Sequence, residues 1–185
     1  CVLGSQPRCD DPIFAINNAK AYAEVGVRDI VCTGPCSLPW PHRFSRWVDG
    51  KRVTKEVTYD QLLDSLETVI QELDHKNNDR TRAYVTPFGV VTSIEVSGPT
   101  GADRVIAPTE WDLYQAKEMR RIAAKYNTRI HTDAFGGMIR LAAMDKENAL
   151  LGPDVHIQHC TGLSMDEVLI LQKTDTHVSF APGMR

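Results

Sequence analysis

Apolar residues along the chain recur alternately at helical spacing and in short runs typical of strands. Intervals of three and four residues predict helices at 10–27, 57–75, 108–127, 136–152 and 163–173. Short apolar runs bounded by turn residues predict strands at 27–34, 81–91, 92–107, 128–135, 153–160 and 176–182. Residues 35–53, with three prolines and two tryptophans, read as a long irregular loop.

Capping residues support three of these helices. Thr58 with Gln61, and Ser164 with Glu167, have the spacing of a capping box, in which side chains and backbone amides satisfy one another at a helix start. Thr109 is placed to cap the helix that follows it.

Strands and helices alternate almost without exception. A parallel pair of strands needs a long crossover connection, so this order predicts an α/β fold with a parallel sheet in a single domain over 1–185. Two arrangements of the parallel sheet fit this order, a closed TIM-type barrel and an open doubly wound sheet. In both, functional residues gather at the carboxyl ends of the strands.

Composition excludes several classes of partner. The 185 residues carry a net charge of -3 with scattered Lys and Arg, which disfavours nucleic acid. No apolar run approaches the ~20 residues of a membrane span, and no signal peptide is visible at the start. Five cysteines, an odd number, predict reduced thiols and a cytoplasmic protein. Because the chain starts with Cys1, we expect a piece of a longer protein, and a processed mature chain is the competing explanation.

Polar residues stand near the ends of two predicted strands. His131 and Asp133 are two residues apart and should share one face of their strand, because side chains alternate. On the next strand His156 and His159 should point to opposite faces. His159 lies nearer the carboxyl end, so we predict that it converges with His131 and that His156 is turned away. Two imidazoles and a carboxylate are suitable ligands for zinc or iron.

The long loop that follows the strand at 27–34 offers a second group of candidates. Trp40, His42 and Arg43 lie in it and could cover a substrate pocket. Packing against a neighbouring chain or domain is the alternative explanation for these aromatic residues.

The segments "RIHTDAFGG" and "LLGPDVHIQHCTGLSMDEVLILQKTDTHVSFAP" resemble the metal-dependent amidohydrolase superfamily, and in particular the group with cytosine deaminase and atrazine chlorohydrolase. The "HCTGLS" step is similar to the end of that group's sixth barrel strand. This resemblance implies a partial (β/α)8 TIM barrel, roughly strands two to seven, as a single incomplete amidohydrolase-type domain.

The same resemblance implies a metal-dependent hydrolase that opens C–N or similar bonds of a small cyclic or amide-like substrate with metal-activated water. The cofactor would be a divalent metal, zinc or else iron, bound by His131 or Asp133, with His159 as the catalytic residue. Trp40, His42 and Arg43 would contact the small-molecule substrate, and the oligomeric state stays open, a homo-oligomer included. The group's proton-shuttling glutamate has no counterpart, since its position is occupied by Ala134 or Gly136. We expect these 185 residues alone to be inactive, because a zinc site takes three or four protein ligands and this chain offers two or three candidates.

Two alternatives remain open at this point. "RIHTDAFGG" also resembles a strand of fold-type I pyridoxal-phosphate enzymes, which would need a Schiff-base lysine. Lys146 and Lys173 are the only lysines that follow Gly137, and both fall in predicted helices. The other alternative is a barrel remnant that binds a ligand or partner without catalysis.

Overall fold

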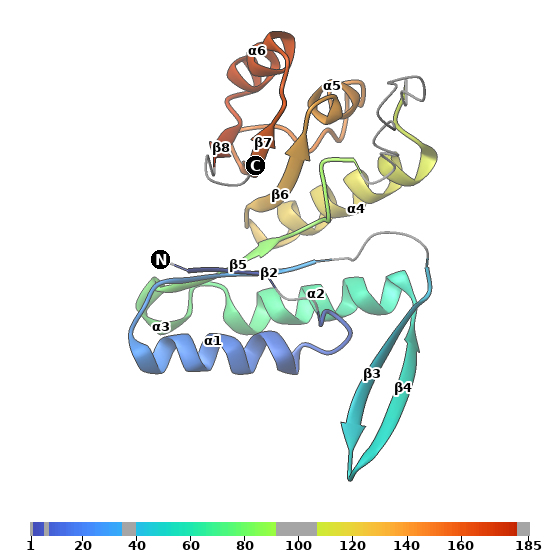
Figure 1. The fold of residues 1–185 in the computed structure, drawn as a ribbon. Coiled ribbons are helices and arrows are strands. Elements are labelled where there is room, and N and C mark those ends of the chain that lie inside the picture. Colours follow the sequence, from blue (N-terminus) through green and yellow to red (C-terminus); the bar gives the residue numbers. More distant parts are fainter. Residues whose placement is uncertain (1, 6–7, 35–39, 92–106, 181–185) are drawn as a thin grey trace. The chain divides into compact units, whose positions relative to one another are not determined.

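The computed structural model describes residues 2–5, 8–34, 40–91 and 107–180, and its contacts cluster into two compact units, 1–85 and 86–185. Each unit is α/β (Figure 1). The single-domain organisation stays a prediction.

The first unit is a parallel sheet of three strands with its helices on one side. Its elements are β1 (Val2–Ser5), α1 (Ile13–Val25), β2 (Asp29–Thr33), β3 (His42–Val48), β4 (Lys51–Val57), α2 (Tyr59–Leu73), α3 (Lys76–Asp79) and β5 (Thr81–Val85). Strands β1, β2 and β5 are neighbours in that order and run parallel. Helices α1 and α2 cover the same face of this sheet (Figure 1). Strand β1 was not predicted from the sequence.

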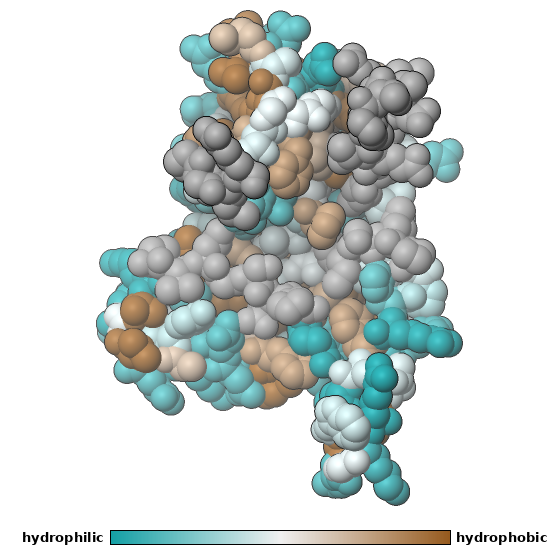
Figure 2. All heavy atoms as spheres, in the orientation of Figure 1, coloured by the Kyte–Doolittle hydropathy of each residue, from teal (hydrophilic) through white to brown (hydrophobic). Residues whose placement is uncertain are grey.

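The segment expected to be an irregular loop contains a β-hairpin instead. Strands β3 and β4 pair antiparallel from His42↔Val57 to Val48↔Lys51. Asp49 and Gly50 connect them, both with positive φ (48° and 74°), which is the geometry of the tight turn that Asp-Gly favours. The hairpin extends away from the sheet of its unit (Figure 1), and its surface is mostly hydrophilic (Figure 2).

The second unit repeats the strand-then-helix order. Its elements are α4 (Glu110–Tyr126), β6 (Ile130–Phe135), α5 (Met138–Ala142), β7 (Val155–Thr161), α6 (Met165–Thr174) and β8 (His177–Ser179). Strand β7 pairs in parallel with β6 on one side and with β8 on the other. The capping boxes at Thr58 and Ser164 are confirmed, and Thr109 caps α4 with Asp112 as its partner.

The helix predicted at 136–152 is much shorter, because α5 ends at Ala142. Asp145 explains the early end. Its Oδ1 accepts hydrogen bonds from the backbone amides of Glu147 (3.0 Å) and Asn148 (2.9 Å). Such a side-chain turn offers the backbone an alternative to helical hydrogen bonds.

The strand order distinguishes the two arrangements that the sequence left open. In both units each parallel strand lies beside the next parallel strand along the chain. A doubly wound sheet reverses direction and places helices on both faces, whereas a barrel winds one way with its helices outside. The sequential order, with α1 and α2 on one face, is the barrel type. Five predicted strands are confirmed, and the one at 92–107 lies almost wholly outside the described residues.

Apolar side chains are exposed on α6. Met165, Val168 and Leu169 recur at helical spacing and are 72%, 45% and 52% exposed, and brown residues gather there in Figure 2. No helix in the described part of the chain combines the length and hydropathy needed to cross a membrane.

Glu167 joins the two turns that lead from β6 to α5 and from β7 to α6. The residue is 1% exposed, and its Oε1 accepts hydrogen bonds from the amides of Gly137 (2.8 Å) and Ile139 (3.2 Å) at the start of α5. Its Oε2 accepts from the amide (3.0 Å) and the hydroxyl (3.1 Å) of Ser164. One buried carboxylate therefore caps two helices.

The same two turns touch through their backbones. The Gly136 amide donates to the Thr161 carbonyl at 3.0 Å. A Cβ atom at Gly136 would lie 2.2 Å from the carbonyl oxygen of Gly162, a distance that no side chain tolerates. Gly162 itself has a φ of 72°. Glycine at 136 is thus required by close approach, and glycine at 162 is favoured by its backbone conformation.

Asp29 at the start of β2 is a buried carboxyl group without a hydrogen bond to either oxygen, and it is 1% exposed. Burial raises the pKa of this carboxyl from 3.8 to about 6. The folded state therefore binds its proton more tightly than the unfolded state does. The group favours folding below about pH 4, and its contribution is lost as the pH rises to about 6.

We expect Asp29→Asn to be more stable than the wild type at pH 7, by at most about 3 kcal/mol, because one pKa unit corresponds to about 1.4 kcal/mol. The difference should shrink toward zero as the pH falls to 4. Denaturant unfolding between pH 4 and 8 measures it, with the exposed Asp64→Asn as the matched control. A gap that does not change with pH would contradict the burial argument.

We expect Glu167→Gln to lower the free energy of unfolding by about 1–3 kcal/mol for each backbone amide that loses its acceptor, since the new amide group faces donors. Glu147→Gln, at an exposed position, is the control. Denaturant melts of both variants test this. Equal stability of the two would show that the four hydrogen bonds contribute nothing net.

Candidate active site

Strands β6 and β7 carry a polar face and an apolar face. Ile130, Ala134, Val155 and Ile157 are fully buried on one side. The opposite side carries the candidate residues, because the register pairs His131 with His156 and Asp133 with Gln158. The polar face therefore runs across both strands.

His131 has His156 as its imidazole partner, so the prediction that His156 is turned away was wrong. Their Nδ1 atoms are 2.8 Å apart and the ring centroids 4.8 Å. Burial, and then the neighbouring His156, lower the pKa of His131 to about 4. Burial also lowers the pKa of His156. Both rings are therefore neutral at pH 7, the form in which an imidazole binds a metal.

Two electron-pair donors on this face lack partners. His131 Nε2 and Asp133 Oδ1 are both buried and make no hydrogen bond. Burial raises the pKa of the Asp133 carboxyl, against smaller opposing effects of Gln158 and His159. The Gln158 amide also lies close enough to His131 to affect its pKa, but no hydrogen bond reaches Nε2. Buried polar atoms without partners are uncommon and point to a missing ligand.

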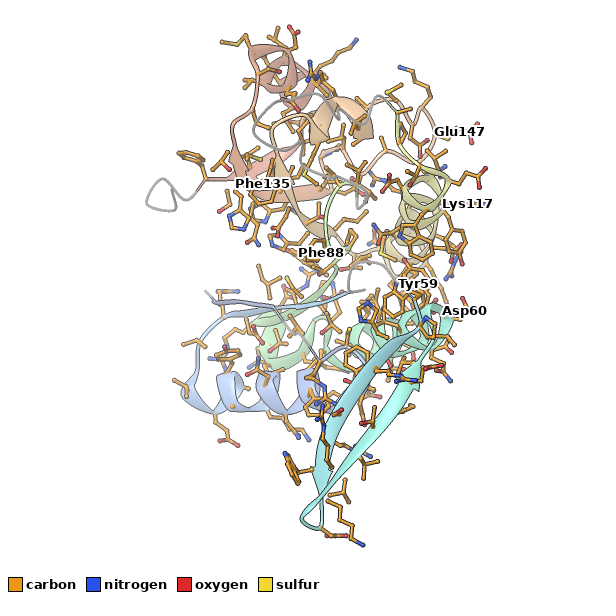
Figure 3. All side chains as sticks on the ribbon, turned by 45° about the vertical axis from the view of Figure 1, so that its right-hand side comes forward. Tyr59, Asp60, Phe88, Lys117, Phe135 and Glu147 are labelled. Carbon is orange, nitrogen blue, oxygen red and sulfur yellow. The ribbon has the colours of Figure 1, made fainter. Side chains whose placement is uncertain are left out.

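A β-bulge turns His159 onto the polar face. The register runs from Ala134↔His159 to Phe135↔Thr161, which leaves Cys160 unpaired, and both His159 (φ 68°) and Cys160 (φ 50°) are left-handed. His159 Nε2 consequently lies 3.8 Å from Asp133 Oδ1. Its ring stacks on Phe135 with centroids 5.4 Å apart; Figure 3 labels Phe135. Bulges often redirect a side chain beside an active site.

Cys160 does not offer a nucleophile. It is a free, buried cysteine, and burial raises the pKa of its thiol to about 11. The thiolate, which is the reactive form, is therefore scarce at neutral pH.

Trp40, His42 and Arg43 belong to the first unit, at the base of the hairpin. Trp40 packs with Phe44 against Cys9, Val57 and Leu62, and its ring meets those of His42 (4.5 Å) and Tyr59 (5.3 Å) edge-on. The exposed Arg43 pairs across the strands with Glu56 at 3.3 Å. Their role in substrate binding stays a prediction.

Sequence reasoning missed two members of the site, Gln158 and Phe135, and misplaced a third, His156. A signal for His156 was present, because "RIHTD" and "DVHIQ" each place histidine directly after the first apolar residue of the strand. Aligning the strand starts would have paired His131 with His156. The bulge at His159 has no comparable signal.

Among the described residues, no group of three or more His, Cys, Asp or Glu side chains is arranged to hold a metal ion. The Nε2 atom of His131 and the Oδ1 atom of Asp133, which make no hydrogen bond, are nevertheless suitable ligand atoms for a divalent cation. Together they would supply two of the four ligands of a zinc site.

Comparison with protein-family models gives no match, and neither does comparison with curated proteins. Solved structures do match. An atrazine chlorohydrolase from Arthrobacter aurescens, in complex with zinc and atraton, superposes with a TM-score of 0.65 at 12% identity, over 97% of this chain and 38% of that one. A guanine deaminase from C. acetobutylicum with bound guanine gives 0.63 at 13%, over 92% and 37%.

An amidohydrolase from an environmental sample of the Sargasso sea matches with a TM-score of 0.60 at 18% identity, over 89% of this chain and 34% of that one. The chain thus spans a little over a third of the length of the structures it matches. These likenesses and the sequential parallel strands agree with the resemblance seen in the sequence. The chain has the fold of part of a (β/α)8 barrel, like that of the structures it matches.

Proposed function

We propose that this chain is part of a metal-dependent hydrolase that opens C–N or similar bonds of small cyclic or amide-like substrates. The observation that carries the proposal is the pair of buried, unpartnered ligand atoms, His131 Nε2 and Asp133 Oδ1, on the polar face of β6. Both are electron-pair donors, so one cation would satisfy them together. The likeness to zinc- and guanine-binding structures supports this assignment.

When bound, a divalent cation such as zinc or iron would lower the pKa of a water molecule to near 7 and so supply a nucleophile. His131 and Asp133 would hold the cation. They are fewer than the three or four protein ligands of zinc sites, so further ligands must come from outside the described residues. The low pKa of His131 keeps its ring unprotonated and available for ligation at neutral pH.

We assign His159 the role of contacting the reacting group of the substrate. Its ring is fixed from one side by Phe135 and lies 3.8 Å from Asp133. From this position an imidazole N–H can donate to the oxygen or nitrogen on which negative charge develops. Loss of one such donor typically costs 10²–10³ in rate.

Trp40, His42 and Arg43 remain our candidates for contacts with the substrate. They follow the carboxyl end of β2, the edge of a barrel sheet on which loops form binding sites. Guanine and atraton, bound by two of the matched structures, are planar nitrogen heterocycles, so substrates of that class are the first to assay. The cytoplasmic location stays a prediction, and the oligomeric state stays open.

The pyridoxal-phosphate alternative gains no support from its lysines. Lys173 lies within α6, and Lys146 lies in the turn after α5 rather than in the predicted helix. Neither lysine lies at the end of a strand, where its amine could form a Schiff base with a cofactor stacked on His131. A non-catalytic barrel remnant is the remaining alternative.

We expect His131→Ala and Asp133→Ala to lower the metal content of the whole protein, while His159→Ala retains metal and loses about 100-fold or more in turnover. Metal analysis beside steady-state hydrolysis of guanine and s-triazine substrates measures both quantities. His75→Ala, which changes an exposed histidine of the first unit, is the matched control.

Two results would contradict the proposal. Full metal and full activity in all three variants would show that the site is misassigned. Stoichiometric ligand binding without turnover in the wild type, at normal metal content, would favour the non-catalytic alternative.

A further inference from the structure

His131 and His156 form a hydrogen bond whose direction decides what His131 can do. The two Nδ1 atoms are 2.8 Å apart, a hydrogen-bond distance, so one of them carries the proton and the other a lone pair. A neutral imidazole has one N–H and one lone pair, so one ring donates and the other accepts. If His131 donates from Nδ1, its Nε2 carries a lone pair; if it accepts, its Nε2 carries a proton.

We propose that His156 is a positioning residue that accepts the Nδ1 proton of His131 and so holds the Nε2 lone pair of His131 toward the cation. This inference rests on the proposed function and assigns His156 a role within that site. His131 is the group that touches the cation, and His156 acts only through it.

The burial of His131 Nε2 favours this direction. The atom is buried and has no hydrogen-bond partner. A proton on it would be an unpaired donor in the interior, which costs about 1–3 kcal/mol. A lone pair in the same place is the form a cation would satisfy. Asp133 Oδ1, two residues away on the same face, is likewise an unpaired acceptor.

Among the residues that the structure describes, Gln158 is the neighbour that could reverse the assignment. Its amide lies near His131, and a hydrogen bond from Nε2–H to the Gln158 carbonyl would turn His156 into the donor. No such bond of accepted geometry is formed. Gln158 also faces Asp133 across the register, and its amide lowers the pKa of that carboxyl against the larger effect of burial.

The sheet itself supplies the geometry of the pair. His131 and His156 are direct register partners on adjacent parallel strands, and His177 on β8 is the next partner of His156. His156 is therefore fixed by backbone pairing on both sides. Outer partners that take the second N–H of a metal-bound histidine fix its tautomer and ring orientation, and their loss typically weakens metal binding 10–100-fold.

The test reads the tautomer of His131 directly by ¹⁵N NMR of the metal-free whole protein at pH 7. We expect the proton on Nδ1 in the wild type and in His156→Asn, whose side-chain oxygen can accept at the same place. His156→Leu should lose this preference and bind zinc about 10–100-fold more weakly in chelator competition. His177→Ala and Gln158→Leu are the controls and should keep the wild-type tautomer.

A proton on Nε2 of His131 in the wild type would overturn the inference, and so would an unchanged tautomer in His156→Leu. The wild-type spectrum decides even if that variant does not fold. A proton on Nδ1 in a protein that binds no zinc would refute the proposed function while leaving the tautomer assignment intact. Zinc binding together with a proton on Nε2 of His131 in the metal-free form would refute the tautomer assignment and leave the proposed function intact.

Discussion

The arrangement of the second unit depends on one buried carboxylate. Glu167 receives four hydrogen bonds from the starts of α5 and α6, and these helices begin directly after the strands that carry the candidate residues. Asp133 and Phe135 end one strand, and His159 lies near the end of the other. Glu167 is 1% exposed, so these four hydrogen bonds are shielded from water. The distance between the two strand ends is therefore set by hydrogen bonds between the turns that follow them.

The polar face itself combines regular and irregular backbone. Regular pairing aligns His131 with His156, whereas two consecutive left-handed residues bring His159 around to Asp133. Non-glycine residues in this conformation are uncommon and persist only where neighbours hold them in place. The stacked ring of Phe135 and the Gly136–Thr161 hydrogen bond are such neighbours. The fold thus uses backbone strain to place one imidazole and regular pairing to place the other two.

Local chemistry explains what the sequence could predict. Helices α2, α4 and α6 were recognisable because Thr58, Thr109 and Ser164 satisfy their own first turns. The hairpin was missed although Asp49 and Gly50 signalled it, because prolines and aromatics nearby suggested a loop. Alternation placed His131 and Asp133 correctly on one face, but it assumed a regular strand at His159. A bulge depends on the neighbouring strand and on the Gly136–Gly162 contact, so no pattern within β7 could reveal it.

The contact between Gly136 and Gly162 also bears on how such a protein can change over time. Two loops whose backbones touch cannot accept insertions or side chains independently, since a change in one displaces the other and the polar face beneath them. The two turns that carry Gly136 and Gly162 are therefore fixed relative to each other. Variation in substrate range is then left to segments outside these two turns, and the hydrophilic hairpin between β2 and α2, which forms a two-stranded sheet of its own, is one such segment.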